Sequence, residues 1–307
     1  MLKDNKWRNP AAIVECEWLF NRLGDENIRI FDCTTYLHYT DDHPSKPYDV
    51  ESGFSDYKKN SIPGAAFIDV QNDLSDQNSI YSLTLPNFQG LGESVKRLGI
   101  GDPYHVILYA KNGMQWATRV WYLLYSLGYE NVSILNGGVS EWCKLSFPME
   151  PGGKIFAPAE FDLKIKESKF VDKNDVLEAI DDNNTIIINS LTEDIHLGQS
   201  RRYGRPGRIP KSINIPFHTL VDQETGKFKQ PKDAYEIFTS NGVTLDKKVI
   251  NSNSLKLDLE SGVYLLKISN NSRVVNSKNR NRKTKSKTKH RSQQMMYEHY
   301  LNKIEKN

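Results

Sequence analysis

Short apolar runs alternate with amphipathic segments along residues 12–150. The apolar runs have the length of buried strands, and the segments between them have the three-to-four-residue spacing of a helix. Such alternation is typical of an α/β protein with a parallel sheet covered by helices on both faces. We predict strands at 28–31, within 62–69, at 105–109 and at 132–135, and helices at 15–23, 92–98, 116–127 and around Trp142.

A second part of the chain repeats this order less completely. An apolar run at 185–188 predicts a strand, the stretch 208–216 is similar to 61–68, and 242–250 is similar to 99–107. The two halves therefore look like an internal duplication. After Ile250 the repeated pattern stops.

A break in composition separates the halves. Residues 148–158 begin and end with proline and contain Gly152 and Gly153, which is typical of a linker. We therefore predict two tandem domains of the same fold, the second truncated and less stable over 161–250. The predicted boundaries are 1–150 for the first domain, 151–160 for the linker, 161–266 for the incomplete second domain and 267–307 for a basic, largely disordered tail.

Composition narrows the class of protein. The 307 residues are 38% apolar and 26% charged, as in a soluble globular protein, and no apolar stretch approaches the roughly 18 residues of a membrane span. The first residues lack the apolar core of a signal peptide. Three scattered cysteines do not suggest a disulfide framework. We expect a reducing, cytoplasmic location and no membrane partner.

The charge is unevenly distributed. Residues 267–307 carry 12 Lys and Arg against two Glu, a charge of +10, whereas the first 266 residues carry −7. Such a tail could be a nucleic-acid arm, a localisation signal, or the product of an alternative exon or intron read-through. Residues 270–291 contain no aromatic residue, so stacking on bases is not indicated.

One strand–loop–helix unit has the form of a site for an anionic nucleophile. The strand 105–109 leads through the loop 110–115 into a helix, whose N-terminus directs backbone N–H groups and a positive dipole end at the loop. A thiolate suits such a loop. The loop begins with Ala110, however, and superposing the duplicated halves places Asn253 against Ala110 and Lys256 against Gly113.

Several short motifs together resemble one family. In the first half these are Glu17-Trp-Leu, Arg29-Ile-Phe-Asp32, Ile62-Pro-Gly-Ala65, Leu98-Gly-Ile-Gly101, Arg119-Val-Trp, Gly128-Tyr-Glu-Asn-Val-Ser133, and Gly137-Gly138 with Trp142; in the second half, Gly198, Ile209-Pro210, Asn214-Ile-Pro-Phe217, Leu220-Val-Asp222 and Lys247-Lys-Val-Ile250. As a set they resemble the two-domain sulfurtransferases, rhodanese (thiosulfate sulfurtransferase) and 3-mercaptopyruvate sulfurtransferase.

The resemblance implies a mechanism that uses no cofactor. A cysteine at the start of the second domain's loop takes sulfur from thiosulfate or mercaptopyruvate as a persulfide and passes it to a thiol, cyanide or protein acceptor. In this chain that position aligns with Asn253, and the loop glycine aligns with Lys256. The family also makes a mitochondrial location possible.

The resemblance further implies arginines that hold the substrate carboxylate early in the second domain. Leu191 and Ile195 stand where two of them are expected. Other arginines lie nearby with different spacing and are the candidates for binding an anionic substrate: Arg201, Arg202, Arg205 and Arg208. Arg119 is expected to brace the first domain's loop.

Other chemistry-bearing residues have simpler structural explanations. Cys33 follows a predicted strand and could be a nucleophile, although a packed thiol is the more usual state. Cys16 and Cys143 are expected to pack on helices. Asp32, Asp69 and Asp73 fit loop and helix capping better than an acid–base cluster, and the histidines show no zinc-ligand spacing, so no metal is expected.

The sequence therefore leaves two functions open. The family resemblance predicts a sulfurtransferase with a small sulfur donor and a thiol acceptor, and the missing cysteine predicts that this chain is weakly active or inactive. The alternative is a non-catalytic rhodanese-like binding module. Nucleic-acid binding through the tail is a third and less favoured possibility.

Overall fold

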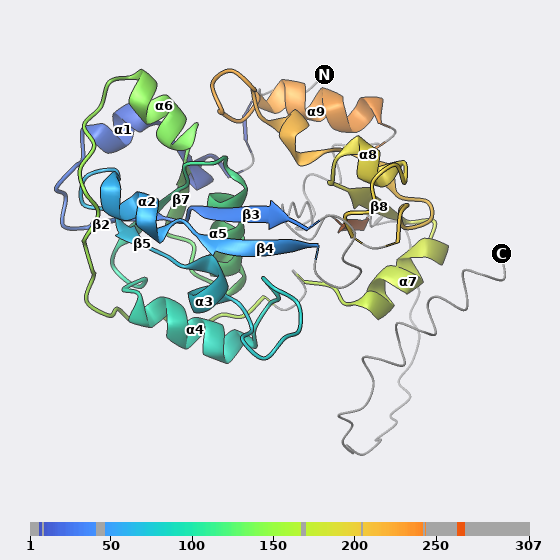
Figure 1. Ribbon diagram of the computed structural model, residues 1–307, viewed down its shortest axis with the longest axis horizontal. Helices are drawn as coiled ribbons and strands as arrows, with labels where there is room; N and C mark the ends of the chain where they lie inside the picture. Colours follow the sequence, from blue (N-terminus) through green and yellow to red (C-terminus); the bar gives the residue numbers. More distant parts are fainter. Residues whose placement is uncertain are drawn as a thin grey trace, which may run out of the picture. The chain divides into compact units, whose positions relative to one another are not determined.

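A computed structural model describes residues 6–7, 9–40, 47–166, 170–203, 205–241 and 243, together with the backbone of 263–267. Asn253, Lys256 and most of the predicted tail lie outside these residues. The described elements form two sheets with surrounding helices and one separate hairpin (Figure 1).

The first sheet has five strands in the order β1-β7-β6-β2-β5, and every neighbouring pair is parallel. This confirms the predicted parallel sheet. Its strands are β1 (Ile13–Val14), β2 (Ile28–Asp32), β5 (Ala66–Phe67), β6 (His105–Tyr109) and β7 (Val132–Leu135). The short 3₁₀ turn Pro10–Ala12 precedes β1. The edge strand β1, with only two residues, was not predicted.

Six helices accompany the first sheet: α1 (Cys16–Phe20), α2 (Phe54–Lys59), α3 (Val70–Leu74), α4 (Phe88–Arg97), α5 (Gln115–Ser126) and α6 (Gly138–Lys144). α1 ends at Phe20, earlier than predicted. α4 begins earlier than predicted, because the Asn87 side chain caps it by accepting a hydrogen bond from the Gly90 amide at 2.7 Å.

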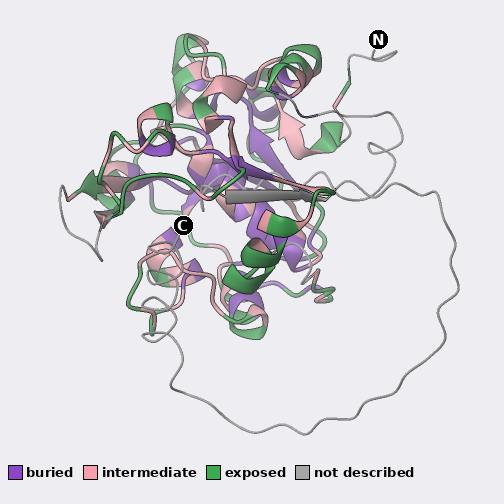
Figure 2. Cartoon of the chain, turned by 90° about the vertical axis from the view of Figure 1, so that its right-hand side faces the viewer, coloured by how far each residue is buried: buried purple, intermediate pink, exposed green. Residues whose placement is uncertain are grey.

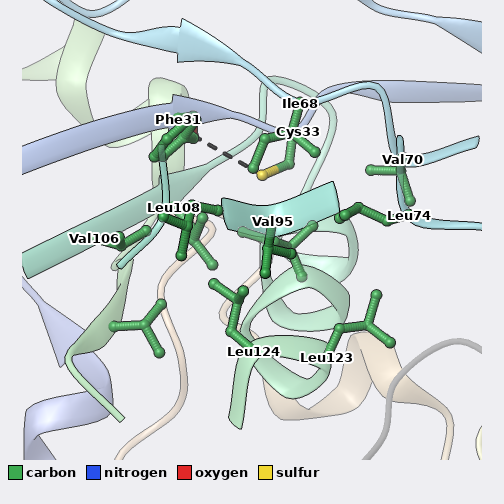
Figure 3. Close-up of a cluster of buried hydrophobic side chains, with 14 of the residues drawn as sticks. Phe31, Cys33, Ile68, Val70, Leu74, Val95, Val106, Leu108, Leu123 and Leu124 are labelled. Atoms are coloured by element: carbon green, nitrogen blue, oxygen red, sulfur yellow. Dashed lines mark hydrogen bonds between the residues drawn. The ribbon is translucent and has the colours of Figure 1, made fainter. Parts of the chain in front are cut away.

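Side chains alternate between the two faces of the first sheet. Phe31, Val106 and Leu108 join a core that α3, α4 and α5 cover (Figure 3). Ile30 and Ile107 point to the opposite face, where α1 and α6 cover a second core that includes the fully buried Trp142. Buried residues gather on the strands and on the inward sides of helices (Figure 2). The predicted helical layers on both faces are thus present.

A two-stranded antiparallel hairpin stands apart from the first sheet. It consists of β3 (Thr35–Tyr39) and β4 (Tyr48–Ser52), and Tyr39 pairs with Tyr48. Its polar and aromatic side chains are largely half-buried or exposed. The pattern of residues 35–52 did not lead us to predict this hairpin.

Residues 151–166 have no regular secondary structure but lie against the first region. The Ala159 amide donates to the Lys96 carbonyl at 3.0 Å, and the Lys164 amide donates to the Leu127 carbonyl at 2.9 Å. Phe161 is buried in the same core as α4 and α5. We call residues 151–166 the strap, because they cover the ends of these two helices.

The second sheet has the order β10-β8-β9. Its strands are β8 (Thr185–Asn189), β9 (Ile213–Asn214) and β10 (Val263–Lys267); β8 and β9 are parallel, whereas β10 runs antiparallel to β8. The helices nearby are α7 (Lys173–Asp181), α8 (Glu193–His196), α9 (Pro231–Ser240) and the 3₁₀ turn Phe217–Leu220. A small core joins Ile188, Ile215, Phe238 and Val243. Among the described residues, no helix is long and apolar enough to cross a membrane.

Candidate functional site

The carboxyl ends of the first sheet's strands mark the place where a ligand of this fold is expected. Glu15 follows β1, Cys33 follows β2, Ala110 follows β6 and Asn136 follows β7. These residues begin the loops that would surround a bound molecule. We therefore took this edge as the first candidate site and the matching edge of the second sheet as the second.

The loop after β6 is held by hydrogen bonds to the segments that follow β2 and to α2. Ala110 is buried, and the Lys111 amide donates to the Thr34 hydroxyl at 3.0 Å. The Asn112 amide group donates to the Thr35 carbonyl at 2.6 Å. The Lys111 ammonium points away from the loop and donates to the Asp56 carbonyl at 2.6 Å. The loop is thus well formed, and it has a methyl group where a nucleophile would stand.

A buried carboxylate supports this loop from beneath. Asp32 is fully buried, and it accepts hydrogen bonds from the Thr34 amide at 2.9 Å and from the Thr34 hydroxyl. Burial raises the pKa of Asp32 above its usual value, although these hydrogen bonds and the Lys111 charge oppose the shift. The Thr34 hydroxyl also accepts a hydrogen bond from the Lys111 amide. Asp32 therefore positions the loop after β6 through Thr34.

The other two candidate carboxylates also act as caps. Asp69 caps α3 by accepting from the Asn72 amide at 2.9 Å, and Asp73 accepts from the Asp69 amide at 3.0 Å. The prediction that Asp69 and Asp73 are capping groups is confirmed. Among the described residues, no three His, Cys, Asp or Glu side chains gather as a metal site would require.

Part of the first edge is covered by a turn from the second half of the chain. Residues 221–228 form this turn, which we call the docking turn. The Lys227 ammonium lies 3.1 Å from a Glu15 carboxylate oxygen and 3.0 Å from one of Glu141. The Phe228 amide donates to the Asn136 side-chain oxygen at 2.9 Å. A residue of this chain therefore occupies the edge near β1 and β7.

Two of the three cysteines are enclosed. Cys33 is fully buried among apolar side chains, with its sulfur 3.9 Å from the Phe31 carbonyl oxygen (Figure 3). Cys16 is also fully buried, and burial, aided by the Glu141 charge, raises the pKa of its thiol to about 12. Both thiols are therefore protonated at neutral pH or inaccessible, as expected of packed cysteines.

Cys143 differs from the prediction. We expected it to pack, but it is exposed on α6. Its neighbour Trp142 faces the core, and successive helical residues are about 100° apart, so Cys143 turns toward solvent. It lies within the helix, away from the loop after β6.

The edge of the second sheet is built from amide side chains. The Asn189 side-chain amide lies 3.2 Å from His196 Nδ1, and the Asn214 side chain donates to the Leu191 carbonyl at 2.9 Å. Burial, together with the charge of Arg208, lowers the pKa of His196. Ile195, at a position where the resemblance implies an arginine, is buried instead. These groups hold the loops in place and offer no nucleophile.

The four candidate arginines belong to one loop but make different contacts. Arg202 lies over the Tyr39 ring, 3.7 Å from its centroid, and Arg208 donates to the His196 carbonyl at 3.3 Å. Arg201 and Arg205 are exposed. Arg119 donates to the Leu83 carbonyl, so it braces a loop between α3 and α4.

The sequence analysis missed the residues that join the two edges. Asn136 follows the predicted strand 132–135 and could have been suspected from that position alone. Lys227 and Tyr39 had no such signal, because each acts on residues far away in the sequence. The aligned nucleophile position, Asn253, lies outside the described residues.

Comparison with known proteins agrees with this architecture. The Rhodanese-like domain family matches residues 15–145. The 3-mercaptopyruvate sulfurtransferase of Homo sapiens is 29% identical over 248 residues, which cover 78% of this chain and 80% of that protein. The thiosulfate sulfurtransferase of Bos taurus is 27% identical over 249 residues, with coverage of 78% and 80%.

A solved structure with the same fold agrees with these sequence matches. The crystal structure of SseA from Escherichia coli, described for the rhodanese fold of 3-mercaptopyruvate sulfotransferases, superposes with a TM-score of 0.62 and 27% identity over 76% of this chain and 85% of that one. Residues 15–145 therefore match the Rhodanese-like domain family, and the chain is similar to 3-mercaptopyruvate and thiosulfate sulfurtransferases over 78% of its length.

Proposed function

We propose that this chain is a sulfurtransferase-family protein with little or no persulfide-forming activity of its own. One observation carries the proposal: neither described sheet edge presents a cysteine to solvent. Ala110 stands at the loop of the first edge, and Cys33 beside it is sealed in the core.

The chemistry of sulfur transfer explains why this matters. A persulfide forms only when a thiolate reaches the sulfur donor, and a buried, protonated thiol does neither. Loss of a covalent nucleophile typically lowers the rate by several orders of magnitude, even where binding survives. We therefore expect any residual transfer to be far below that of an intact family member.

A non-catalytic binding module is the second candidate function. The first domain supports it, because its sheet, both cores and the loop after β6 are intact although the loop has no nucleophile. A scaffold of this kind retains surfaces for a partner. In this reading the family resemblance describes the fold and ancestry of the chain, and its present role is binding.

A persulfide assay tests the proposal. The purified full chain is incubated with thiosulfate or with 3-mercaptopyruvate, its thiols are alkylated, and each cysteine-containing peptide is examined by mass spectrometry. We expect no added sulfur on Cys16 or Cys33. The Escherichia coli 3-mercaptopyruvate sulfurtransferase serves as the positive control for the donor.

Cys143 provides the internal control, because it is the exposed thiol among the chain's three cysteines. The variant Cys143→Ser separates slow, nonspecific sulfur uptake from catalysis. Stoichiometric persulfide that survives this substitution, with turnover to a thiol or cyanide, would refute the proposal. Turnover that disappears with Cys143→Ser would refute it as well and identify a new nucleophile.

A further inference from the structure

The loop that carries the candidate arginines is a built structure rather than a loose connection. We call residues 198–208 the arginine loop; it contains four arginines and no acidic residue. Its two ends meet: a Cβ atom on Gly198 would lie 3.2 Å from the Gly207 nitrogen. The Gln199 amide also donates to the Asp194 carbonyl at 2.8 Å. The loop is therefore closed at its base.

One arginine fixes the loop to the hairpin. The Arg202 guanidinium stacks on the Tyr39 ring with its carbon 3.7 Å from the ring centroid, a favourable cation–π distance. The Arg202 Nε is buried without a hydrogen-bond partner among the described residues. This contact leaves Arg202 in a support role and orders the arginines beside it.

Arg201 and Arg205 are available to a ligand, whereas Arg208 already donates to the His196 carbonyl at 3.3 Å. Arg201, Arg205 and Arg208 are exposed, and no described carboxylate lies within 4 Å of their guanidinium groups. Hydrogen bonding by Thr192 and, to a lesser degree, the charge of Arg202 lower the pKa of Asp194. Asp194 thus offsets the charge of Arg202 in part.

Aromatic rings lie beside these charges. Tyr39 is 46% exposed and Tyr203 is 39% exposed, and the Tyr39 ring packs edge-on against Tyr48 with centroids 6.4 Å apart. Because Arg202 already lies over one face of the Tyr39 ring, a planar ligand would stack on the exposed part of that ring or on Tyr203. The surface therefore combines positive charge with stacking faces.

This combination selects a class of ligand. Exposed guanidinium groups hold a single small anion weakly, because water and salt screen each contact. A chain of phosphates engages several of them at once, and its bases can use the rings. We propose that the arginine loop and Tyr39 form a binding surface for single-stranded nucleic acid, a function separate from sulfur transfer.

Binding of a labelled oligouridylate to the full chain, followed by fluorescence anisotropy at several salt concentrations, tests this proposal. The double variant Arg201→Gln/Arg205→Gln should bind about tenfold more weakly. The magnitude of the slope of log affinity against log salt should decrease by about 1.4, since each lost phosphate contact on a single strand contributes roughly 0.7.

A matched control removes two exposed charges elsewhere. The variant Lys58→Gln/Lys59→Gln on α2 has the same net charge as the arginine variant but leaves the loop intact. It should bind like the parent chain. Equal affinity of the two double variants would overturn the proposal, because binding would then depend on overall charge or on residues 267–307.

Photo-crosslinking locates the contact directly. Oligonucleotides containing 5-iodouridine should attach to peptides that contain Tyr39 or Tyr203, and Tyr203→Ala should weaken binding about tenfold. Attachment confined to residues 267–307 would contradict the proposal. So would binding of a glutamate-rich peptide as tight as that of the oligonucleotide, because the surface would then suit an acidic protein.

Discussion

The two regions of the chain differ in the size of their sheets and in what these sheets enclose. The first region has five parallel strands with a buried core on each face. The described part of the second region has three strands and one small core around Phe238. The comparison teaches that the larger sheet and both of its cores lie in the region whose loop after β6 begins with Ala110.

The sheet edges of the two regions also differ. In the first region, polar groups at the edge are used within the chain: Asp32 supports Thr34, and Asn136 receives the docking turn. In the second region the arginine loop keeps exposed charges. The polar groups of the first edge are therefore engaged within the chain, whereas the second region carries the surface that we propose for interaction.

Truncating the buried tryptophan of the first region is expected to have the largest effect. Trp142 is fully buried, and its indole N–H donates to the Pro148 carbonyl at 2.8 Å. Trp142→Ala should lower the free energy of unfolding by about 3–5 kcal/mol in urea titrations. Phe238→Ala in the smaller core should cost less, and a larger cost for Phe238 would reverse our ranking of the two regions.

Substituting the buried carboxylate of the first edge should have the next largest effect on stability. Asp32→Ala leaves the Thr34 amide without an acceptor and should cost about 1–3 kcal/mol, whereas Asp32→Asn retains an acceptor and should cost less. Because burial raises the pKa of Asp32, the carboxylate destabilises the fold increasingly as pH rises from 3.8 through the raised pKa. Asp32→Asn should remove this dependence, as urea unfolding across that pH range would show.

Each region contains a histidine whose neutral form is favoured by burial. Burial lowers the pKa of His105 in the first region and, together with Arg208, that of His196 in the second. Stability should therefore be lost as pH falls from 6.5 through each lowered pKa. His105→Gln and His196→Gln should each reduce this loss, measured by thermal unfolding between pH 7 and 5; unchanged pH profiles in both would argue against the assignment.

The ion pairs of the docking turn should contribute less to the free energy of unfolding than the buried groups above. Lys227 is partly exposed, so water weakens its attraction to Glu141 and Glu15. We expect Lys227→Met to cost about 1 kcal/mol or less. A double-mutant cycle with Glu141→Gln isolates the pair, and a coupling free energy of zero would show that the backbone contact at Asn136 holds the turn alone.

Introducing a thiol at the first edge should have the smallest effect of the substitutions considered, with no gain of sulfurtransferase activity. Ala110→Cys places the sulfur at a buried position whose surroundings belong to the core. We expect no persulfide on Cys-containing peptides of this variant after incubation with thiosulfate. Measurable turnover would mean that the first region retains a working sulfur-transfer loop.

Strands buried on both faces were the easiest features to predict. β2, β6 and β7 read as continuous apolar runs, and their observed bounds lie within one residue of the prediction. The helix α5 was predicted equally well from its spacing. The hairpin β3–β4 was missed, because its side chains are only partly buried and its residues do not form a continuous apolar run.

Only those features of the candidate site that depend on neighbouring residues in the sequence could be predicted. Ala110 at the loop is visible in the sequence, because the strand and helix around it are regular. The contact of Phe228 with Asn136 joins residues 92 positions apart, and no local pattern reports it. Cys143 was expected to pack, and its exposure depends on the helical phase that Trp142 sets.

The strap has a consequence for anyone who shortens this chain. A fragment ending at residue 145, where the family match ends, would lose Phe161 and leave part of the core of α4 and α5 open to water. It would also remove the partners of the Lys96 and Leu127 carbonyls. A soluble, monomeric first domain should therefore be sought by ending the fragment after residue 166, where the last hydrogen bond of the strap, from the Lys166 amide to the Ser126 carbonyl at 2.7 Å, is complete.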